Sequence, residues 1–349
     1  MSNQLLISKE ELKELQKFNR LYGEEESKEV ADFFSKICLH AYLNSNKDVK
    51  YFVKKLNEIK EQNANFHLSR ERLCGQISSY NSYEDIIYVN KEHINKHDET
   101  IFFHEVMHLI HKYSSLHSNP PIDYAEKRNR ALDNMHINIE SIMSTTSAIN
   151  EKYQSILKKA RDYVYDNYIL KAGASSVADY IEKEEGKYRE LAKKKGIYDE
   201  LIEMGMNHQN AVVINSKSFE QKLTTYELLN TLIQQIYKDK IDLYSFELSK
   251  GETAYESFID ALLKGEHEEK LLIHYGHTKE YFEKSEGIDF QEVLATYSEI
   301  KNSEEGMKWI ELLKNQVGSD FMEYIEEIYS QVLNKPFSKE LKEEDLLTL

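Results

Sequence analysis

Glycine and proline are scarce in this chain, whose 349 residues include 12 Gly and 3 Pro. All-β sandwiches and barrels need frequent turns built from these residues, so the composition favours a helix-rich fold. Cysteine is scarcer still. The two cysteines, Cys38 and Cys74, lie too far apart for a CxxC motif and are too few for a disulfide framework. We interpret both as reduced, buried thiols.

Positive charge and long apolar runs are also in short supply. Lys and Arg total 45 against 61 Asp and Glu, a formal net charge of -16. Because affinity for phosphate backbones comes from Lys and Arg, we predict no nucleic-acid partner. No run approaches the ~18 apolar residues of a membrane span, so we predict no membrane partner. The start, MSNQLLISKEELKELQ, has no apolar region behind a basic one. We therefore expect a protein that is cytoplasmic as synthesised and that, if exported, is delivered without a signal peptide.

Helical periodicity dominates the rest of the chain. Residues 8–22, 26–43 and 47–62 each place apolar side chains near one face, and Ser8 with Glu11 forms a capping box. The run at 86–89 is β-branched and aromatic and predicts a short strand. Residues 122–250 are helical in pattern, with a further strand possible at 211–214, and 274–277 interrupts the later helices. The predicted fold class is mainly α with a small β-sheet (α+β).

One motif carries chemistry. His104-Glu105-Val106-Met107-His108 matches H-E-x-x-H, and residues at i and i+4 share a helical face about 6 Å apart. His104 and His108 can therefore converge on Zn²⁺. Glu105 would lie beside the metal, where it can take a proton from a zinc-activated water and pass it to a leaving amine. The segment is apolar nearly all round, which predicts a buried helix whose polar groups need partners.

The third ligand is open from spacing alone. His111 shares the face, but a rise of ~1.5 Å per residue puts it about 10 Å from His104. We therefore expect it either to support the zinc ligands or to be the partner of a buried polar group. A helix over GIDFQEVLATYSEIKN (287–302) offers Glu292, with Thr296 and Glu299 on the same face. Either glutamate could be the ligand, and Thr296 could orient a zinc-bound imidazole. Asp289-x-x-Glu292 also reads as a capping box.

Three segments carry a family resemblance. HEVMHLIH, HYGHTKEYF (274–282) and QEVLATYSE (291–299) resemble the metallopeptidase domains of phage head-associated proteins and related mobile-element toxins, and the catalytic domain of the anthrax lethal factor group. These are gluzincin-type zincins. The resemblance covers mainly 84–113 and 255–302, and the sequence departs from the usual pattern at Met107 and Thr296.

The resemblance implies Zn²⁺ as cofactor, a protein or peptide as substrate, and Glu292 as third ligand. It also implies that Tyr275, His277 or Tyr281 polarises the scissile carbonyl, where a phenol or imidazole would meet developing negative charge. Glu299 and Thr296 would support the ligands. The domains expected on this basis are an N-terminal helical region at 1–69, a zincin catalytic core at 70–121 and 251–335, a large helical insertion at 122–250 and a charged tail at 336–349.

We therefore expect a zinc-dependent endopeptidase with Glu105 as general base and substrate extended along the strand at 84–90. Two alternatives remain. One is a catalytically inactive zincin-fold binding or assembly protein of phage or mobile-element origin. The other is a non-peptidase zinc hydrolase resembling the deformylases, which carry a cysteine ligand near a glycine-rich turn, and for which Cys74-Gly75 is the only hint.

Overall fold

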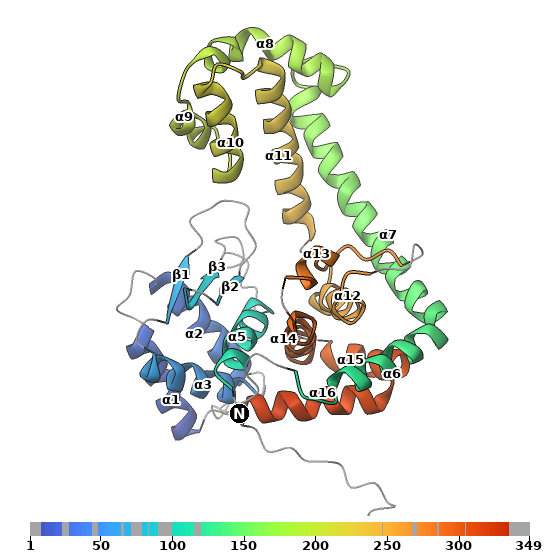
Figure 1. Ribbon diagram of the computed structural model, residues 1–349. Coiled ribbons are helices and arrows are strands. Elements are labelled where there is room, and N and C mark those ends of the chain that lie inside the picture. Colours follow the sequence, from blue (N-terminus) through green and yellow to red (C-terminus); the bar gives the residue numbers. More distant parts are fainter. Residues whose placement is uncertain are drawn as a thin grey trace, which may run out of the picture. The chain divides into compact units, whose positions relative to one another are not determined.

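The structure is a computed structural model, and the chain in it is mostly helical with a small mixed sheet of three strands, which confirms the predicted class (Figure 1). The described residues are 8–22, 28–43, 48–63, 66–70, 79–82, 84–89, 100–114, 120–245, 247–266, 271–284, 286–303 and 305–334. Cys74 and the predicted tail at 336–349 lie outside them. Two compact units divide the described chain: unit 1 holds those of residues 1–70, 78–146 and 250–349, and unit 2 those of 147–249.

Unit 1 begins with three helices, α1 (Lys9–Tyr22), α2 (Lys28–Leu43) and α3 (Val49–Gln62). The capping box predicted at the start of α1 is confirmed: the Glu11 N–H donates to Ser8 Oγ at 3.2 Å, and the Ser8 N–H donates to Glu11 Oε2 at 2.8 Å. Phe18 and Tyr22 on the apolar face of α1 are fully buried.

The first three helices share a core with the motif helix, α5 (Thr100–Lys112). Phe34 and Phe52 lie 5.1 and 5.8 Å from Phe102 between ring centroids, and Phe52 meets Phe103 edge-on at 5.3 Å. Such aromatic contacts add about 0.5–1.5 kcal/mol each beyond the area they bury. The N-terminal helices expected as a separate region therefore help to fix α5 in place.

The sheet contains β1 (His67–Arg70), β2 (Ser79–Asn81) and β3 (Ile86–Val89) in the order β1-β3-β2. β3 pairs in parallel with β1 and antiparallel with β2, with Tyr80 opposite Ile87. β3 therefore has a strand on each side, and the expectation that substrate extends along the strand at 84–90 does not fit this sheet, because a peptide adds to a free strand edge. Ile87 and Val89 of β3 are fully buried, and an apolar, β-branched run indicates burial rather than an exposed edge.

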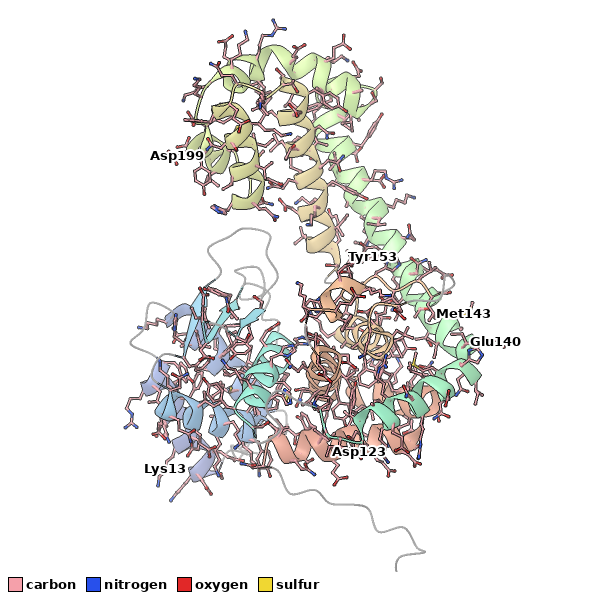
Figure 2. The ribbon with its side chains drawn as sticks, in the orientation of Figure 1. Lys13, Asp123, Glu140, Met143, Tyr153 and Asp199 are labelled. Atoms are coloured by element: carbon pink, nitrogen blue, oxygen red, sulfur yellow. The ribbon has the colours of Figure 1, made fainter. Side chains whose placement is uncertain are left out.

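The centre of unit 1 is α14 (Ile288–Asn302), which packs against α5 and against α12 (Lys250–Leu263) (Figure 1). The Ser298 hydroxyl donates to the Phe103 carbonyl at 2.8 Å, a direct link between α14 and α5. Helices α6 (Tyr124–Ile137), α15 (Gly306–Val317) and α16 (Ser319–Val332) complete the unit. Asp123, labelled in Figure 2, precedes α6 and accepts a hydrogen bond from Tyr324 of α16. The short α13 (Lys279–Phe282) precedes α14.

In unit 2, the secondary-structure elements among the described residues are all helices, joined by turns and short loops. The unit contains most of α7 (Ile139–Val164), the π-helical turn η1 (Tyr165–Ile169), α8 (Val177–Lys193), α9 (Tyr198–Glu203), α10 (His208–Phe219) and α11 (Thr225–Ser245). The expected insertion starts at 122, whereas α6 and the first part of α7 belong to unit 1. Among the described residues, no helix has the length and apolar character needed to cross a membrane.

The strand considered at 211–214 is wrong, because these residues lie within α10. Asn207 caps that helix by accepting the Asn210 N–H at 2.8 Å. Ala211 and Ile214 are buried, while Val212 and Val213 are exposed. This is a helical spacing, and it shows that a short β-branched run is a weak strand signal when its flanks form a helix.

Candidate metal centre

The two histidines of the motif converge with a glutamate from a distant helix. His104 and His108 lie one turn apart on α5, and their Nε2 atoms are 3.3 Å apart. Glu292 of α14 places Oε2 3.7 Å from His104 Nε2 and Oε1 3.6 Å from His108 Nε2. Their candidate ligand atoms all lie within 4.8 Å of one another. The structure thus brings together the three residues expected to bind a metal.

This donor set fits zinc. Two imidazole nitrogens and a carboxylate are common Zn²⁺ ligands, at about 2.0–2.2 Å from the ion, which places tetrahedral ligands about 3.3 Å from one another. The three separations here, 3.3, 3.6 and 3.7 Å, are close to that value. Two facing imidazole nitrogens repel if both carry protons, so they need either one shared proton or a common cation.

The two candidate third ligands, Glu292 and Glu299, face different nitrogens of the His104 ring. Glu299 Oε2 lies 3.1 Å from Nδ1 of His104, on the side of the ring away from Glu292. A hydrogen bond from Nδ1 to this carboxylate leaves the Nε2 lone pair directed towards His108 and Glu292. Glu292 therefore lies on the Nε2 side of His104, together with His108, and Glu299 lies on the Nδ1 side, within hydrogen-bond distance of the ring.

The electrostatics of the cluster keep two of its members ready to bind a cation. Burial raises the pKa of Glu292, but the imidazoles of His108, His277 and His104 outweigh it and hold that pKa well below its usual range. Burial also lowers the pKa of His108 to about 4, with Glu292 opposing the shift and His104 adding to it. A charged carboxylate and a neutral imidazole are the forms that bind metal.

His104 behaves differently from its neighbour. Burial disfavours its charged form, but the hydrogen bond to Glu299 and the charges of Glu105 and Glu292 outweigh burial and raise its pKa to about 10. A metal ion at Nε2 must therefore displace a proton from this ring, so we expect binding to release protons.

Glu105 lies next to the ligands and is held by the sheet. Its Oε2 accepts the backbone N–H of Tyr80, in β2, at 2.8 Å. Burial raises the pKa of Glu105 to about 7, with Glu292 and Glu299 adding to the shift and His104 and the Tyr80 N–H opposing it. A carboxylate with a pKa near 7 can both accept and return a proton near neutral pH.

A phenol and an imidazole face Glu292 from the segment before α14. Tyr281 of α13 donates to Glu292 Oε1 at 2.6 Å, and His277 Nε2 lies 3.7 Å from Oε2. Their rings stack, with centroids 3.7 Å apart. Of the three residues left open by the sequence, His277 and Tyr281 contact the cluster. Tyr275 binds α12 instead, through its backbone N–H to Glu256.

The remaining expectations about supporting residues change. Thr296 donates its hydroxyl to the Glu292 carbonyl at 2.6 Å, so it bonds within α14 rather than to an imidazole. A threonine inside a helix commonly makes this bond to the carbonyl one turn back. His111 is buried and meets the ring of Phe290 edge-on at 5.4 Å. Glu299 takes the orienting role expected of Thr296.

The capping-box interpretation of Asp289 and Glu292 is also wrong. The residue before α14 is Gly287, at φ 83°, a left-handed conformation that favours glycine. Asp289 lies inside the first turn, with Oδ2 3.7 Å from Arg128 Nε and Oδ1 3.4 Å from Lys264 Nζ. The Glu292 side chain is therefore free of any capping role and points to the histidines.

Sequence reasoning missed two buried acidic side chains on α12, Glu256 and Asp260, which bind the segment that carries His277. Their signal was present: two acids one turn apart in the apolar stretch AYESFIDALL. Tyr80 was missed because its contribution is a backbone N–H, which no side-chain pattern reveals. No protein-family model, curated protein or solved structure matches this chain.

Proposed function

We propose that this protein is a zinc-dependent endopeptidase with a zincin-like core, in which His104, His108 and Glu292 hold the ion. The convergence of these three residues at separations suited to one tetrahedral ion carries the proposal. It is supported by the H-E-x-x-H spacing and by the way the resembling segments meet at one place in unit 1. Bound zinc would polarise a peptide carbonyl and lower the pKa of water towards 7.

Glu105 would act as the general base. It would take a proton from the attacking water and return it to the amine that leaves. The Tyr80 N–H keeps the carboxylate in position. Glu299 would keep His104 oriented through Nδ1.

Tyr281 and His277 would donate hydrogen bonds to the carbonyl oxygen as negative charge develops on it. Both face Glu292 from the same side, and their stacked rings limit each other's rotation. Because both donors already lie beside Glu292, they would need only to turn from that carboxylate to the developing charge.

We further propose that an extended peptide substrate lies along β2. Within the described residues β2 pairs with β3 only, and it also holds Glu105. Peptides often bind by adding a strand to such an edge, which supplies affinity through backbone hydrogen bonds. In this proposal β2 takes the place of β3, the strand along which the sequence analysis expected the substrate to lie.

The test is Glu105→Gln. The variant should keep stoichiometric zinc by metal analysis and lose about 10²–10⁴-fold in cleavage of a peptide library followed by mass spectrometry. The matched control is Glu61→Gln, at an exposed ion pair with Lys17, which should retain full cleavage. Loss of zinc in Glu105→Gln would mean that Glu105 is a ligand. Bound zinc without turnover in the wild-type chain would contradict the peptidase and favour a binding or assembly protein.

A further inference from the structure

Two buried carboxylates on α12 bind the backbone of the loop at 271–278, named here the site loop. Glu256 and Asp260 are 0% and 1% exposed and lie one turn apart on the same face of the helix. Glu256 Oε2 accepts the N–H groups of His274 at 3.0 Å and Tyr275 at 3.3 Å. Asp260 Oδ2 accepts the His277 N–H at 2.6 Å. Three backbone amides of the site loop are thus held by two charged acceptors.

Gly276 permits this close approach. A Cβ at that position would lie 2.3 Å from Oδ2 and 2.4 Å from Cγ of Asp260, well inside any real contact. The Asp260 side chain is buried and already engaged by His277, so it has little room to move. Any larger residue at 276 would therefore push the carboxylate away from the amide that it binds.

The burial of these carboxylates needs an explanation. Most of the surrounding α12 residues are apolar and fully buried, as Tyr255, Phe258 and Ile259 show, and an aliphatic side chain would pack there without the cost of burying charge. The site loop has no helix or strand of its own, so its amides need acceptors from elsewhere. Charge-assisted hydrogen bonds supply them at about twice the strength of neutral ones.

The site loop leads directly to the groups that face the cluster of His104, His108 and Glu292. His277 is the residue whose amide Asp260 holds, and its imidazole lies 3.7 Å from Glu292. Tyr281 follows in α13, stacks on His277 and donates to Glu292. A shift of the loop backbone would therefore displace both donors together.

We propose that Glu256 and Asp260 are positioning residues, which hold the site loop by its backbone amides and so keep His277 and Tyr281 directed at Glu292. This inference deepens the proposed function and rests on it for the role of the two donors. The carboxylates act at a distance from the reacting atoms, through the loop rather than on substrate.

The first arm of the test measures the loop itself in the full chain. Hydrogen–deuterium exchange of a peptide spanning 271–282 should rise by about tenfold or more in Asp260→Ala, because a hydrogen bond to a charged acceptor is lost. Gly276→Ala should raise the exchange by a similar factor, because its Cβ displaces the Asp260 carboxylate without leaving a cavity in α12. Asp260→Asn keeps an acceptor oxygen but loses the charge, so its exchange should lie between those of the wild type and Asp260→Ala.

The matched control is Asp48→Ala. Asp48 is another buried carboxylate of unit 1, and it accepts a hydrogen bond from Tyr329 of α16. Its loss should lower the melting temperature and leave exchange in 271–282 unchanged. If Asp48→Ala loosens the site loop as much as Asp260→Ala does, the effect is general destabilisation and the proposal fails.

The second arm measures zinc content and the two kinetic constants on a cleaved peptide. Asp260→Ala and Gly276→Ala should keep stoichiometric zinc, lose about 10–100-fold in kcat and change KM by about threefold or less, and Asp260→Asn should recover part of the lost kcat. Unchanged kcat in a variant with a loosened loop would overturn the positioning role. If the wild-type chain cleaves nothing, the proposed function fails, while the exchange arm still decides whether the two carboxylates hold the loop.

Discussion

The two units of this protein bury different kinds of side chain. Among the described residues, unit 1 buries one imidazole and six carboxyl groups, namely His111, Asp48, Glu252, Glu256, Asp260, Asp289 and Glu292. The buried polar residues of unit 2 are Ser218 and Gln235, neither of them ionisable. Burying a charge costs several kcal/mol unless it is paired and hydrogen-bonded. Unit 1 bears that cost at several places, one of which is the candidate metal centre, whereas unit 2 avoids it.

The core of unit 2 fits a purely structural role for its buried residues. Its central residues include Leu201, Ile214 and Leu228, and Gln235 satisfies its amide by donating to the Gly205 carbonyl and accepting the Asn207 N–H. Charged pairs such as Lys217 with Glu227 lie at the surface. The comparison shows that, among the described residues, the buried carboxyl and imidazole side chains lie in the same unit as the H-E-x-x-H motif.

The sharpest way to break the comparison is Glu292→Ala. If the buried carboxylate of α14 is a zinc ligand, the variant should lose at least about 100-fold in zinc affinity, beyond what loss of a supporting residue typically costs. Competition with a chromophoric chelator measures this. Retained stoichiometric zinc would remove Glu292 from the ligand set. The control is Glu326→Gln, a carboxylate of α16 that accepts from Tyr297, which should leave affinity unchanged.

A core substitution in unit 2 should lower the stability of the protein and leave its zinc affinity unchanged. Leu228 is fully buried in its core, so Leu228→Ala should destabilise the fold by about 2–5 kcal/mol, as measured by urea unfolding. Zinc affinity should stay at the wild-type value. Val213→Ala, at an exposed site of α10, is the matched control and should change stability by about 0.5 kcal/mol or less. Weaker zinc binding in folded Leu228→Ala would show that the two units are coupled.

Glu299→Gln tests the residue behind His104. Gln can still accept from Nδ1 but carries no charge, so zinc affinity should fall by about 10–100-fold, less than in Glu292→Ala. The same chelator competition measures both variants. A larger loss in Glu299→Gln than in Glu292→Ala would reverse the assignment of ligand and supporting residue.

The smallest expected effect concerns acid. Burial opposes the charged form of Asp85, but hydrogen bonds from Lys112, Tyr80 and Tyr113 outweigh it and lower its pKa. As the pH falls, the Asp85 carboxylate therefore binds a proton in the unfolded chain before it does so in the folded chain. The contribution of Asp85 to the free energy of unfolding is complete above the unfolded pKa of about 3.9 and is lost as the pH falls below it. Between pH 6 and 3, the free energy of unfolding should therefore fall less steeply with pH in Asp85→Asn than in the wild type.

Asn is a suitable replacement at position 85. The backbone there has φ 55°, a left-handed conformation that Asn tolerates well, and Asn keeps one acceptor for Lys112 or Tyr80. We expect a cost of about 1 kcal/mol or less at pH 7. The control Asp199→Asn, at an exposed carboxylate of α9 in unit 2, should leave the acid limb unchanged. An unaltered slope in Asp85→Asn would contradict the prediction.

Local features of this protein were predictable because they depend on neighbours in the chain. The capping box of Ser8 and Glu11 is closed within one turn. The shared face of His104 and His108 follows from the pitch of a helix and needs no tertiary contact. The one strand that the sequence indicated correctly, at 86–89, was recognisable from composition, although its interior place in the sheet was not.

The sequence by itself determined the helix-rich class, the strand and the paired histidines, since helical pitch and side-chain preference act over a few residues. Only the tertiary structure decided that Glu292 joins the histidines while Glu299 orients one of them, because both lie on one helix and differ only in which side of His104 they reach. It also decided that Tyr281 rather than Tyr275 meets the cluster. Those choices depend on how α12 and α14 pack, and packing joins residues that no local pattern connects.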